Sequence, residues 1–249
     1  MTSALIIFPH QLFADHPGLA LQPDLVVLFE DPLFFGDPVY PANFHKQKLW
    51  LHRSSMANYK LRLEDAGHRV RLVRYRRDAG LLCQVVAQLG TEGFVVILAS
   101  NPVDDIAGRR LASAAQAAGL RLKLLPTPGF INSAADNQSW SDSRSRWFMA
   151  EFYKHQRRRL GVMMEGDQPM GGQWSFDEDN RKKVPKTLLS EIPPLPRLEP
   201  SPIDLEARAS VLAEFPKAPG KLDRLYLPTT HEAAERCRNV VCPVIQRYC

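Results

Sequence analysis

The sequence predicts an α/β fold, a mostly parallel five-stranded sheet with helices on both faces. Short apolar runs alternate with helical patterns through residue 125, and no hairpin signal separates consecutive strands. Successive strands must therefore be joined by crossover connections, which make a sheet parallel. The composition, with 45% hydrophobic and 24% charged residues among 249, is that of a soluble globular protein long enough for one large domain.

The five predicted strands differ in how many of their faces are expected to be buried. Residues 4–8 and 25–29 are uninterrupted apolar runs, as expected of central strands covered on both faces. Residues 68–75 alternate apolar and basic side chains, which indicates a strand with one face in water. The remaining two strands are predicted at residues 94–98 and 120–125.

Three helices are predicted between these strands. Residues 44–66 place apolar side chains at helical spacing, and Gly67 follows them as a typical helix stop. Residues 81–89 and 104–118 show the same spacing, and Gly119 follows the second of these. This alternation describes a Rossmann-like domain, in which ligands bind beyond the carboxyl ends of the strands.

The regular alternation of strands and helices stops after Pro126. Residues 142–161 read as a basic amphipathic helix ended by Gly161, and residues 169–202 are rich in Pro and Gly, which is typical of a surface connection. A short helical pattern resumes at Ile203. We therefore expect an α/β domain at 1–133, a basic helix and interdomain loop at 134–202, and the truncated start of a helical domain with an atypical tail at 203–249.

Charge and hydropathy restrict the partners. The net charge of +5 permits a polyanion as partner without requiring one. No apolar run approaches the roughly 18–20 residues that cross a bilayer, and the first residues do not form a signal peptide. We therefore expect a cytoplasmic protein without a membrane partner.

The cysteines and the short motifs offer little catalytic chemistry. Three of the four cysteines, Cys237, Cys242 and Cys249, crowd the end of the chain with a spacing that fits neither a zinc ribbon nor a four-thiolate cluster. We expect them to be free thiols and predict no metal ligands. Glycine-rich phosphate loops, a nucleophile elbow and an H-E-x-x-H zinc motif are also missing from the sequence.

Some polar residues at predicted strand and helix ends have both a structural and a functional interpretation. His10 follows the first strand and either bonds to the backbone or contacts a ligand. His45 and Lys48 lie at the start of a helix, where they form either a solvated basic face or an anion site. The run Arg157-Arg158-Arg159 also has a structural interpretation as a solvated basic face, because most helical charge runs are simply solvated.

One segment carries a residue pattern that is much more specific than these single residues. It contains Phe152-Tyr153-Lys154, Arg157-Arg158, Gly161, Met163-Met164, Gly166, Gln168-Pro169, Gly171-Gly172, Trp174, Phe176-Asp177 and Asn180-Arg181. This pattern resembles the interdomain signature of the prokaryotic photolyase/cryptochrome-related family, the bacterial iron-sulfur photolyases. The start of the chain around Gln11 and the stretch from His45 to Arg71 also agree with the family, so the resemblance extends over roughly residues 4–231.

The resemblance implies a two-domain flavoprotein whose full-length members repair UV-damaged DNA. An α/β antenna domain and a long interdomain loop precede a helical domain that holds FAD and a 4Fe-4S cluster. Light-excited reduced FAD donates an electron to a pyrimidine dimer or a 6-4 lesion, splits it and recovers the electron. This chain has about half the family's length and lacks a counterpart of the FAD pocket and cluster cysteines, so we expect it to be inactive alone and predict no catalytic residue.

The resemblance also implies where ligands bind. A ribityllumazine-type antenna would lie at the strand carboxyl ends, with His10, Gln11, Glu30, His45 and Lys48 as the cofactor-binding residues. The loop residues Arg181, Lys182 and Lys183 would contact DNA, since the family places the matching arginine near the lesion. For this chain alone we expect a monomer with at most weak, non-specific DNA binding. The alternative is a sensory or regulatory module that binds a small ligand without photochemistry.

Overall fold

The computed structural model describes residues 2–177, 183, 186–187 and 197–248, with side chains described up to residue 239. The chain divides into two compact units, which are treated separately. Unit 1 comprises Met1–Gly129 and Pro194–Cys249, and unit 2 comprises Phe130–Pro193. The segment that follows the Pro-rich stretch therefore belongs to the same unit as the sheet.

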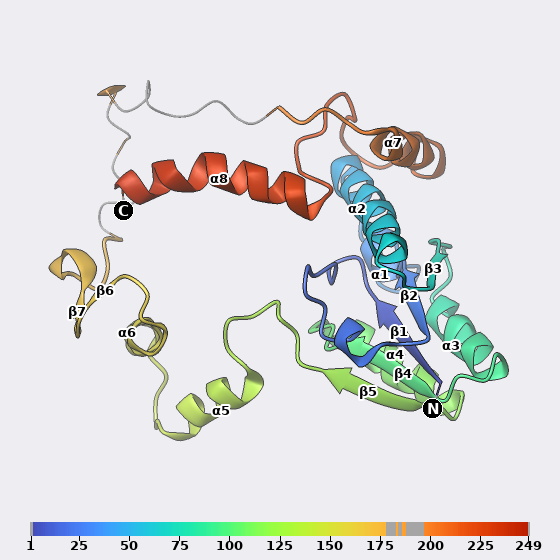
Figure 1. The fold of residues 1–249 in the computed structure, drawn as a ribbon, viewed down its shortest axis with the longest axis horizontal. Helices are drawn as coiled ribbons and strands as arrows, with labels where there is room; N and C mark the ends of the chain where they lie inside the picture. The colour runs from blue at the N-terminus through green and yellow to red at the C-terminus, as the bar shows by residue number, and fades with distance from the viewer. Residues whose placement is uncertain (1, 178–182, 184–185, 188–196, 249) are drawn as a thin grey trace. The chain divides into compact units, whose positions relative to one another are not determined.

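Unit 1 is built on a five-stranded sheet in the order β3-β2-β1-β4-β5, in which every neighbouring pair is parallel (Figure 1). The predicted α/β architecture is thus confirmed. Because chain order reverses between β1 and β4, the carboxyl ends of these two strands form the switch point where such sheets bind ligands. The strands are β1 (Ser3–Ile7), β2 (Leu25–Phe29), β3 (Val70–Val73), β4 (Val96–Ser100) and β5 (Arg121–Leu125).

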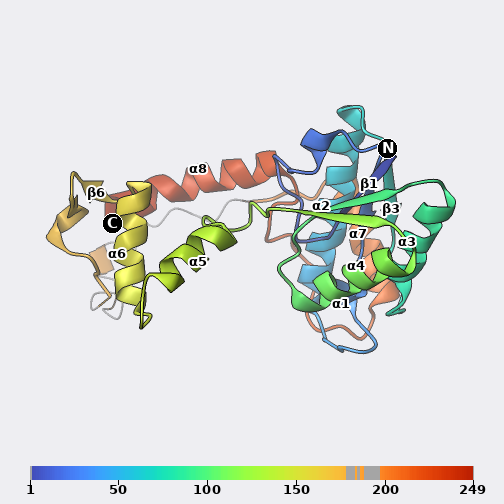
Figure 2. The same ribbon diagram turned by 90° about the horizontal axis from the view of Figure 1, so that it is seen from below.

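Helices cover both faces of this sheet (Figures 1 and 2). Successive side chains of a strand point to opposite faces. Ile6 accordingly belongs to the core under α3 (Leu81–Thr91) and α4 (Asp105–Ala117), whereas Leu5 belongs to the core under α2 (Lys46–Asp65). Burial on both faces explains why the central strands read as uninterrupted apolar runs.

The described residues of unit 1 also contain a 3-10 turn at Leu19–Leu21 and three further α-helices. The short α1 (Pro32–Phe35) follows β2, while α7 (Pro202–Glu214) and α8 (His231–Tyr248) come from the last part of the chain. α7 packs against α2, where the buried Trp50 ring donates from Nε1 to the Asp204 carbonyl at 2.6 Å. An apolar cluster and a buried hydrogen bond therefore join this late segment to the sheet domain.

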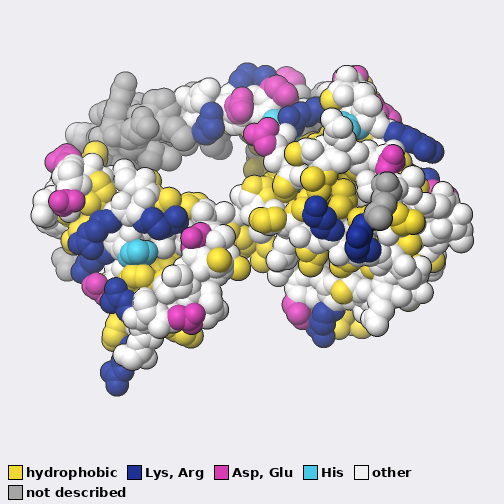
Figure 3. Space-filling model, turned by 60° about the horizontal axis from the view of Figure 1, so that its bottom comes forward, with side chains coloured by type: hydrophobic (Ala, Val, Ile, Leu, Met, Phe, Trp, Pro, Cys, Tyr) yellow, Lys and Arg dark blue, Asp and Glu magenta, His cyan; other side chains and the backbone are white. Residues whose placement is uncertain are grey.

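Unit 2 contains α5 (Ala134–Asp142), α6 (Met149–Leu160), a short antiparallel pair β6 (Met164–Glu165) and β7 (Gln168–Pro169), and a 3-10 turn at Met170–Gly172. The helix expected at 142–161 begins later, at Met149, because Phe148 before it is extended. It ends at Gly161 in the left-handed conformation, as the sequence predicted. Figure 3 shows basic side chains around a histidine on this unit.

Candidate functional site

His10 lies just beyond β1 at the switch point of the sheet. Its Nε2 is 2.9 Å from the carbonyl oxygen of Pro102, which follows β4. A carbonyl can only accept, so Nε2 carries the proton in this contact. The ring also stacks on Phe34, with 4.7 Å between centroids. Partial burial lowers the pKa of His10, while the Pro102 hydrogen bond and the charge of Asp104 act in the opposite direction.

A cleft of about 380 Å³ opens beside His10, between the loop after β1, α2 and the start of α8. Its volume lies within the range of small-molecule sites. His52 lines it and has a buried Nε2 without a hydrogen-bond partner. Burial, with smaller effects of the Lys48 and His10 charges, lowers the pKa of His52 to about 4, so the ring is neutral at pH 7. The other polar lining residues include Ser55, Asn58, Tyr59, Arg62 and His231.

His231 closes one side of the cleft and holds the start of α8 in place. Its Nε2 donates to the Leu12 carbonyl at 2.8 Å, and its Nδ1 accepts from Arg62 at 2.9 Å. Nearby, Asn58 donates to the Thr229 hydroxyl at 3.2 Å. The wall of the cleft therefore consists of segments far apart in the sequence.

Gln11 has a buried amide that serves the fold. Only 1% of the residue is exposed. Its Nε2 donates to the carbonyls of Ser100 and Asn101, both at 3.1 Å, and its Oε1 accepts from the Phe8 amide at 3.4 Å. Gln11 thus ties the loop after β1 to the end of β4 and so positions the neighbouring His10.

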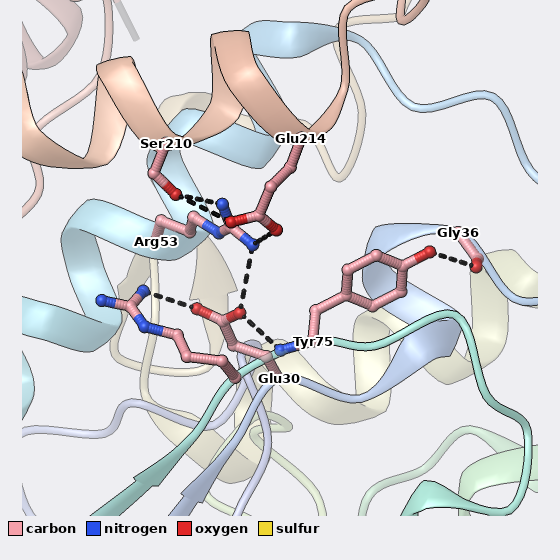
Figure 4. A network of polar contacts seen from close by, with 7 residues as sticks. Glu30, Gly36, Arg53, Tyr75, Ser210 and Glu214 are labelled. Carbon is pink, nitrogen blue, oxygen red and sulfur yellow. Dashed lines mark hydrogen bonds and ion pairs between the residues drawn. The ribbon is translucent and has the colours of Figure 1, made fainter.

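Glu30 is fully buried at the end of β2, in a network that Figure 4 shows. Its carboxylate accepts from Arg74 at 3.0 Å and from the Tyr75 amide at 2.8 Å, and it lies 3.5 Å from the Arg53 guanidinium. Arg53 is fully buried too, and it donates to Ser210 and Glu214 of α7. Glu30 therefore joins β2, β3, α2 and α7, and it does not line the His10 cleft.

His45 and Lys48 occupy the start of α2, outside the lining of the His10 cleft. His45 is the N-cap, and its Nδ1 accepts from the Gln47 amide at 3.1 Å. The exposed Lys48 ammonium lies 4.0 Å from the centre of the Phe44 ring. Burial of part of the side chain lowers the pKa of Lys48. Of the five residues predicted to bind a cofactor, His10 alone lines the cleft.

Sequence reasoning missed His52 and the polar residues beside it. His52, Ser55, Tyr59 and Arg62 all lie on α2 and all line the cleft. Their spacing of three, four and three residues puts them on one helix face, which could have identified the stripe. His231 carries no such signal, because only the fold brings it to this cleft.

The basic residues singled out in the loop and in α6 differ in what the structure shows of them. Arg181 and Lys182 lie outside the described residues, and Lys183 is exposed. Arg157 is not solvated, since only 5% of it is exposed. It donates to the carbonyls of Val162, Met163 and Trp174 and so fastens the hairpin segment of unit 2 to α6.

The sequence pattern described as "Deoxyribodipyrimidine photo-lyase-related protein" matches residues 5–226. The chain belongs to this family. It is 28% identical over 242 residues to a "(6-4) photolyase" from Agrobacterium fabrum, in an alignment that covers 95% of this chain but 46% of that protein. The chain thus spans about half the length of this photolyase. It is also 28% identical over 196 residues to "Uncharacterized protein R852" of Acanthamoeba polyphaga mimivirus, which covers 76% of this chain and 98% of the viral protein.

Membrane-spanning helices and metal sites are both absent from the part of the chain that the structure describes. The described residues contain no helix that is long and apolar enough to cross a membrane. Within the same residues, no three His, Cys, Asp or Glu side chains come together as a metal site would require, and Cys83 and Cys237 are free thiols.

Proposed function

We propose that this chain is the N-terminal α/β half of a photolyase-related protein and that it binds an antenna heterocycle of the ribityllumazine type in the His10 cleft. The observation that carries the proposal is the cleft itself, which has about 380 Å³ and lies at the carboxyl edge of the sheet within the family match. Ligands of open parallel sheets bind at this edge.

The residues of the cleft fit a polar heterocycle. The neutral His52 has a buried ring nitrogen without a partner, and leaving such a group unsatisfied costs free energy. A ligand hydroxyl, which can both donate and accept, would satisfy this nitrogen in either tautomer of the ring. The Pro102 contact of His10 leaves its Nδ1 as a second acceptor. The bound heterocycle would supply light absorption only, so the protein's task is to hold and orient it.

The complete protein would pair this half with a helical half that binds FAD and a 4Fe-4S cluster and repairs DNA. The name of the Agrobacterium relative favours a (6-4) lesion as the substrate of that complete protein. The donor set of the described residues does not fit an iron-sulfur cluster, because no group of ligands comes together there.

Reconstitution with 6,7-dimethyl-8-ribityllumazine tests the antenna proposal. We expect saturable binding to the purified chain, measured by ligand fluorescence anisotropy. His52→Leu should weaken it about tenfold, the effect of losing one buried hydrogen bond. His68→Leu changes a histidine outside the cleft and serves as the matched control. Equal affinity of the His52 and His68 variants would show that the heterocycle binds elsewhere.

A second function, a light-independent sensory or regulatory ligand-binding module, is favoured by the viral relative. The alignment covers 98% of that protein and 76% of this chain, so this relative is no longer than the present chain. Absorption spectra of the chain purified from its host distinguish the two functions. A near-ultraviolet or blue band supports the antenna, whereas a non-absorbing small molecule released on denaturation and detected by mass spectrometry supports the module.

A further inference from the structure

Unit 1 has a second and larger cavity, of about 630 Å³. It lies between α1, the loop that follows it, the residues after β3 and the end of α7. No residue lines both this cavity and the His10 cleft. The two are therefore separate cavities with different lining residues.

One wall of the cavity consists of three aromatic rings. Tyr75 stacks on Phe35 at 5.7 Å between centroids and contacts Phe215 at 5.3 Å. Tyr75 is held at both ends of the residue, because its main-chain amide donates to Glu30 and its side-chain hydroxyl donates to the Gly36 carbonyl at 2.9 Å (Figure 4). A wall of rings fixed in this way suits the face of a planar aromatic ligand.

The charges around the cavity leave an excess of cations. Its two acidic lining residues are engaged elsewhere, since Asp37 pairs with Arg110 and Glu214 pairs with Arg53. Arg77 and Lys217 also line the cavity and are exposed. Among the residues that the structure describes, neither has an ion-pair partner. Two separate unpaired cations suit a dianion better than a single carboxylate.

We propose that this cavity binds a small ligand in which a planar aromatic ring carries a phosphate group, with the ring against Tyr75 and Phe215 and the phosphate between Arg77 and Lys217. The volume is sufficient for a mononucleotide-sized molecule. The proposal does not depend on antenna binding, because it uses none of the residues of the His10 cleft.

The test uses adenosine 5′-monophosphate and adenosine as a matched pair of probes, titrated into the full chain by calorimetry. The monophosphate should bind at least about tenfold more tightly than the nucleoside, since each 1.4 kcal/mol of charge interaction is a factor of ten. The double variant Arg77→Gln/Lys217→Gln should abolish this difference. The double variant Arg76→Gln/Lys221→Gln removes the same charge at exposed positions outside the cavity and should bind as the wild type does.

A second variant tests the aromatic wall. Phe215→Leu keeps an apolar side chain but loses the ring, so it should weaken both probes, while circular dichroism reports whether the fold is retained. Saturating the His10 cleft with ribityllumazine should leave monophosphate binding unchanged. Equal affinity of the two probes, no binding up to about 1 mM, loss of binding in the Arg76/Lys221 control, or competition by the lumazine would each overturn this second site.

Discussion

Each unit of the chain contains a buried arginine, and the two are held in different ways. Arg53 in unit 1 is fully buried between the carboxylates of Glu30 and Glu214. Arg157 in unit 2 donates to three main-chain carbonyls and lies over the rings of Tyr153 and Trp174. Among the described residues, it has no carboxylate partner.

The difference follows from what surrounds each guanidinium. Unit 1 has three apolar clusters, so Arg53 adds α7 to a core that already exists. Unit 2 contributes no residue to these clusters, and in its described part Trp147 and Met149 are largely exposed. In unit 2 the hydrogen bonds of Arg157, rather than an apolar core, join α6 to the hairpin segment. A buried arginine can thus complete an apolar core or substitute for one.

The largest effect should come from breaking the Arg53 pairing. Glu30→Gln leaves a buried guanidinium with one exposed partner, and breaking a buried ion pair typically costs about 3–5 kcal/mol. We expect this loss in the free energy of unfolding of unit 1, measured by urea denaturation. The control Glu92→Gln disrupts the more exposed pair with Arg71 and should cost less than about 1 kcal/mol. Similar losses in both variants would mean that the buried Glu30 contributes no more to the stability of unit 1 than the more exposed Glu92 does.

Asp31 differs from both arginines, because it is a buried ionisable group that has no ion-pair partner among the described residues. Its Oδ1 accepts from the Leu33 amide, while its Oδ2 is buried without a partner. Burial raises the pKa of Asp31 from 3.8 to about 6, with Asp37 and Asp104 acting in the same direction and the Leu33 amide and Arg110 opposing it. A raised folded pKa contributes stability that is present below pH 3.8 and is lost as the pH rises through about 6.

Asp31→Asn should therefore stabilise unit 1 above pH 6 and leave it unchanged near pH 4. Asparagine keeps the acceptor for Leu33 and cannot ionise. The gain at pH 7.5 should reach at most roughly 3 kcal/mol, the value of two pKa units, and thermal unfolding across a pH series measures it. Asp37→Asn is the contrasting control, because it removes the partner of Arg110 and should destabilise at pH 7.5. A pH profile of Asp31→Asn parallel to that of the wild type would contradict this assignment.

Arg157→Lys tests whether unit 2 depends on a planar guanidinium. A lysine keeps the charge but cannot donate from one rigid fork to three carbonyls. We expect a local loss of about 2 kcal/mol, since hydrogen bonds of charged groups are worth roughly 1.5–3 kcal/mol. Faster hydrogen exchange at residues 162–174 would report it, with unit 1 unaffected. Arg159→Lys, at an exposed position of the same turn, is the control, and equal exchange in both would show that Arg157 is dispensable.

The smallest effect concerns DNA. If Arg181, Lys182 and Lys183 contact phosphates, replacing all three by alanine should lower the slope of log affinity against log salt by roughly 2–3. Duplex binding over a salt series measures this slope. An unchanged slope would point to Arg158 and Arg159 as the contacts instead, because Arg157 already donates to three main-chain carbonyls.

Most of the sheet domain could be predicted because its signals are local. Burial on two faces requires uninterrupted apolar strands, and helical spacing with a following glycine marks α2 and α4. The four-residue α1 and the break between α5 and α6 were missed, since short helices carry little periodicity. Of the candidate site, the sequence located His10 at the edge where a cleft exists. It also singled out Gln11 and Glu30, whose polar atoms the structure finds bonded to other parts of the chain.

The burial of the central strands follows from the sequence alone, because apolar burial is non-directional and an uninterrupted apolar strand needs only cover on both faces. The pairing of buried polar groups, in contrast, depends on how distant parts of the chain pack together. Arg53 and Glu214 are 161 positions apart, and Arg62 and His231 are 169 apart. A hydrogen bond forms only when donor and acceptor come within about 3 Å in the right orientation. Such partners are selected by how the elements pack, so no local sequence pattern predicts them.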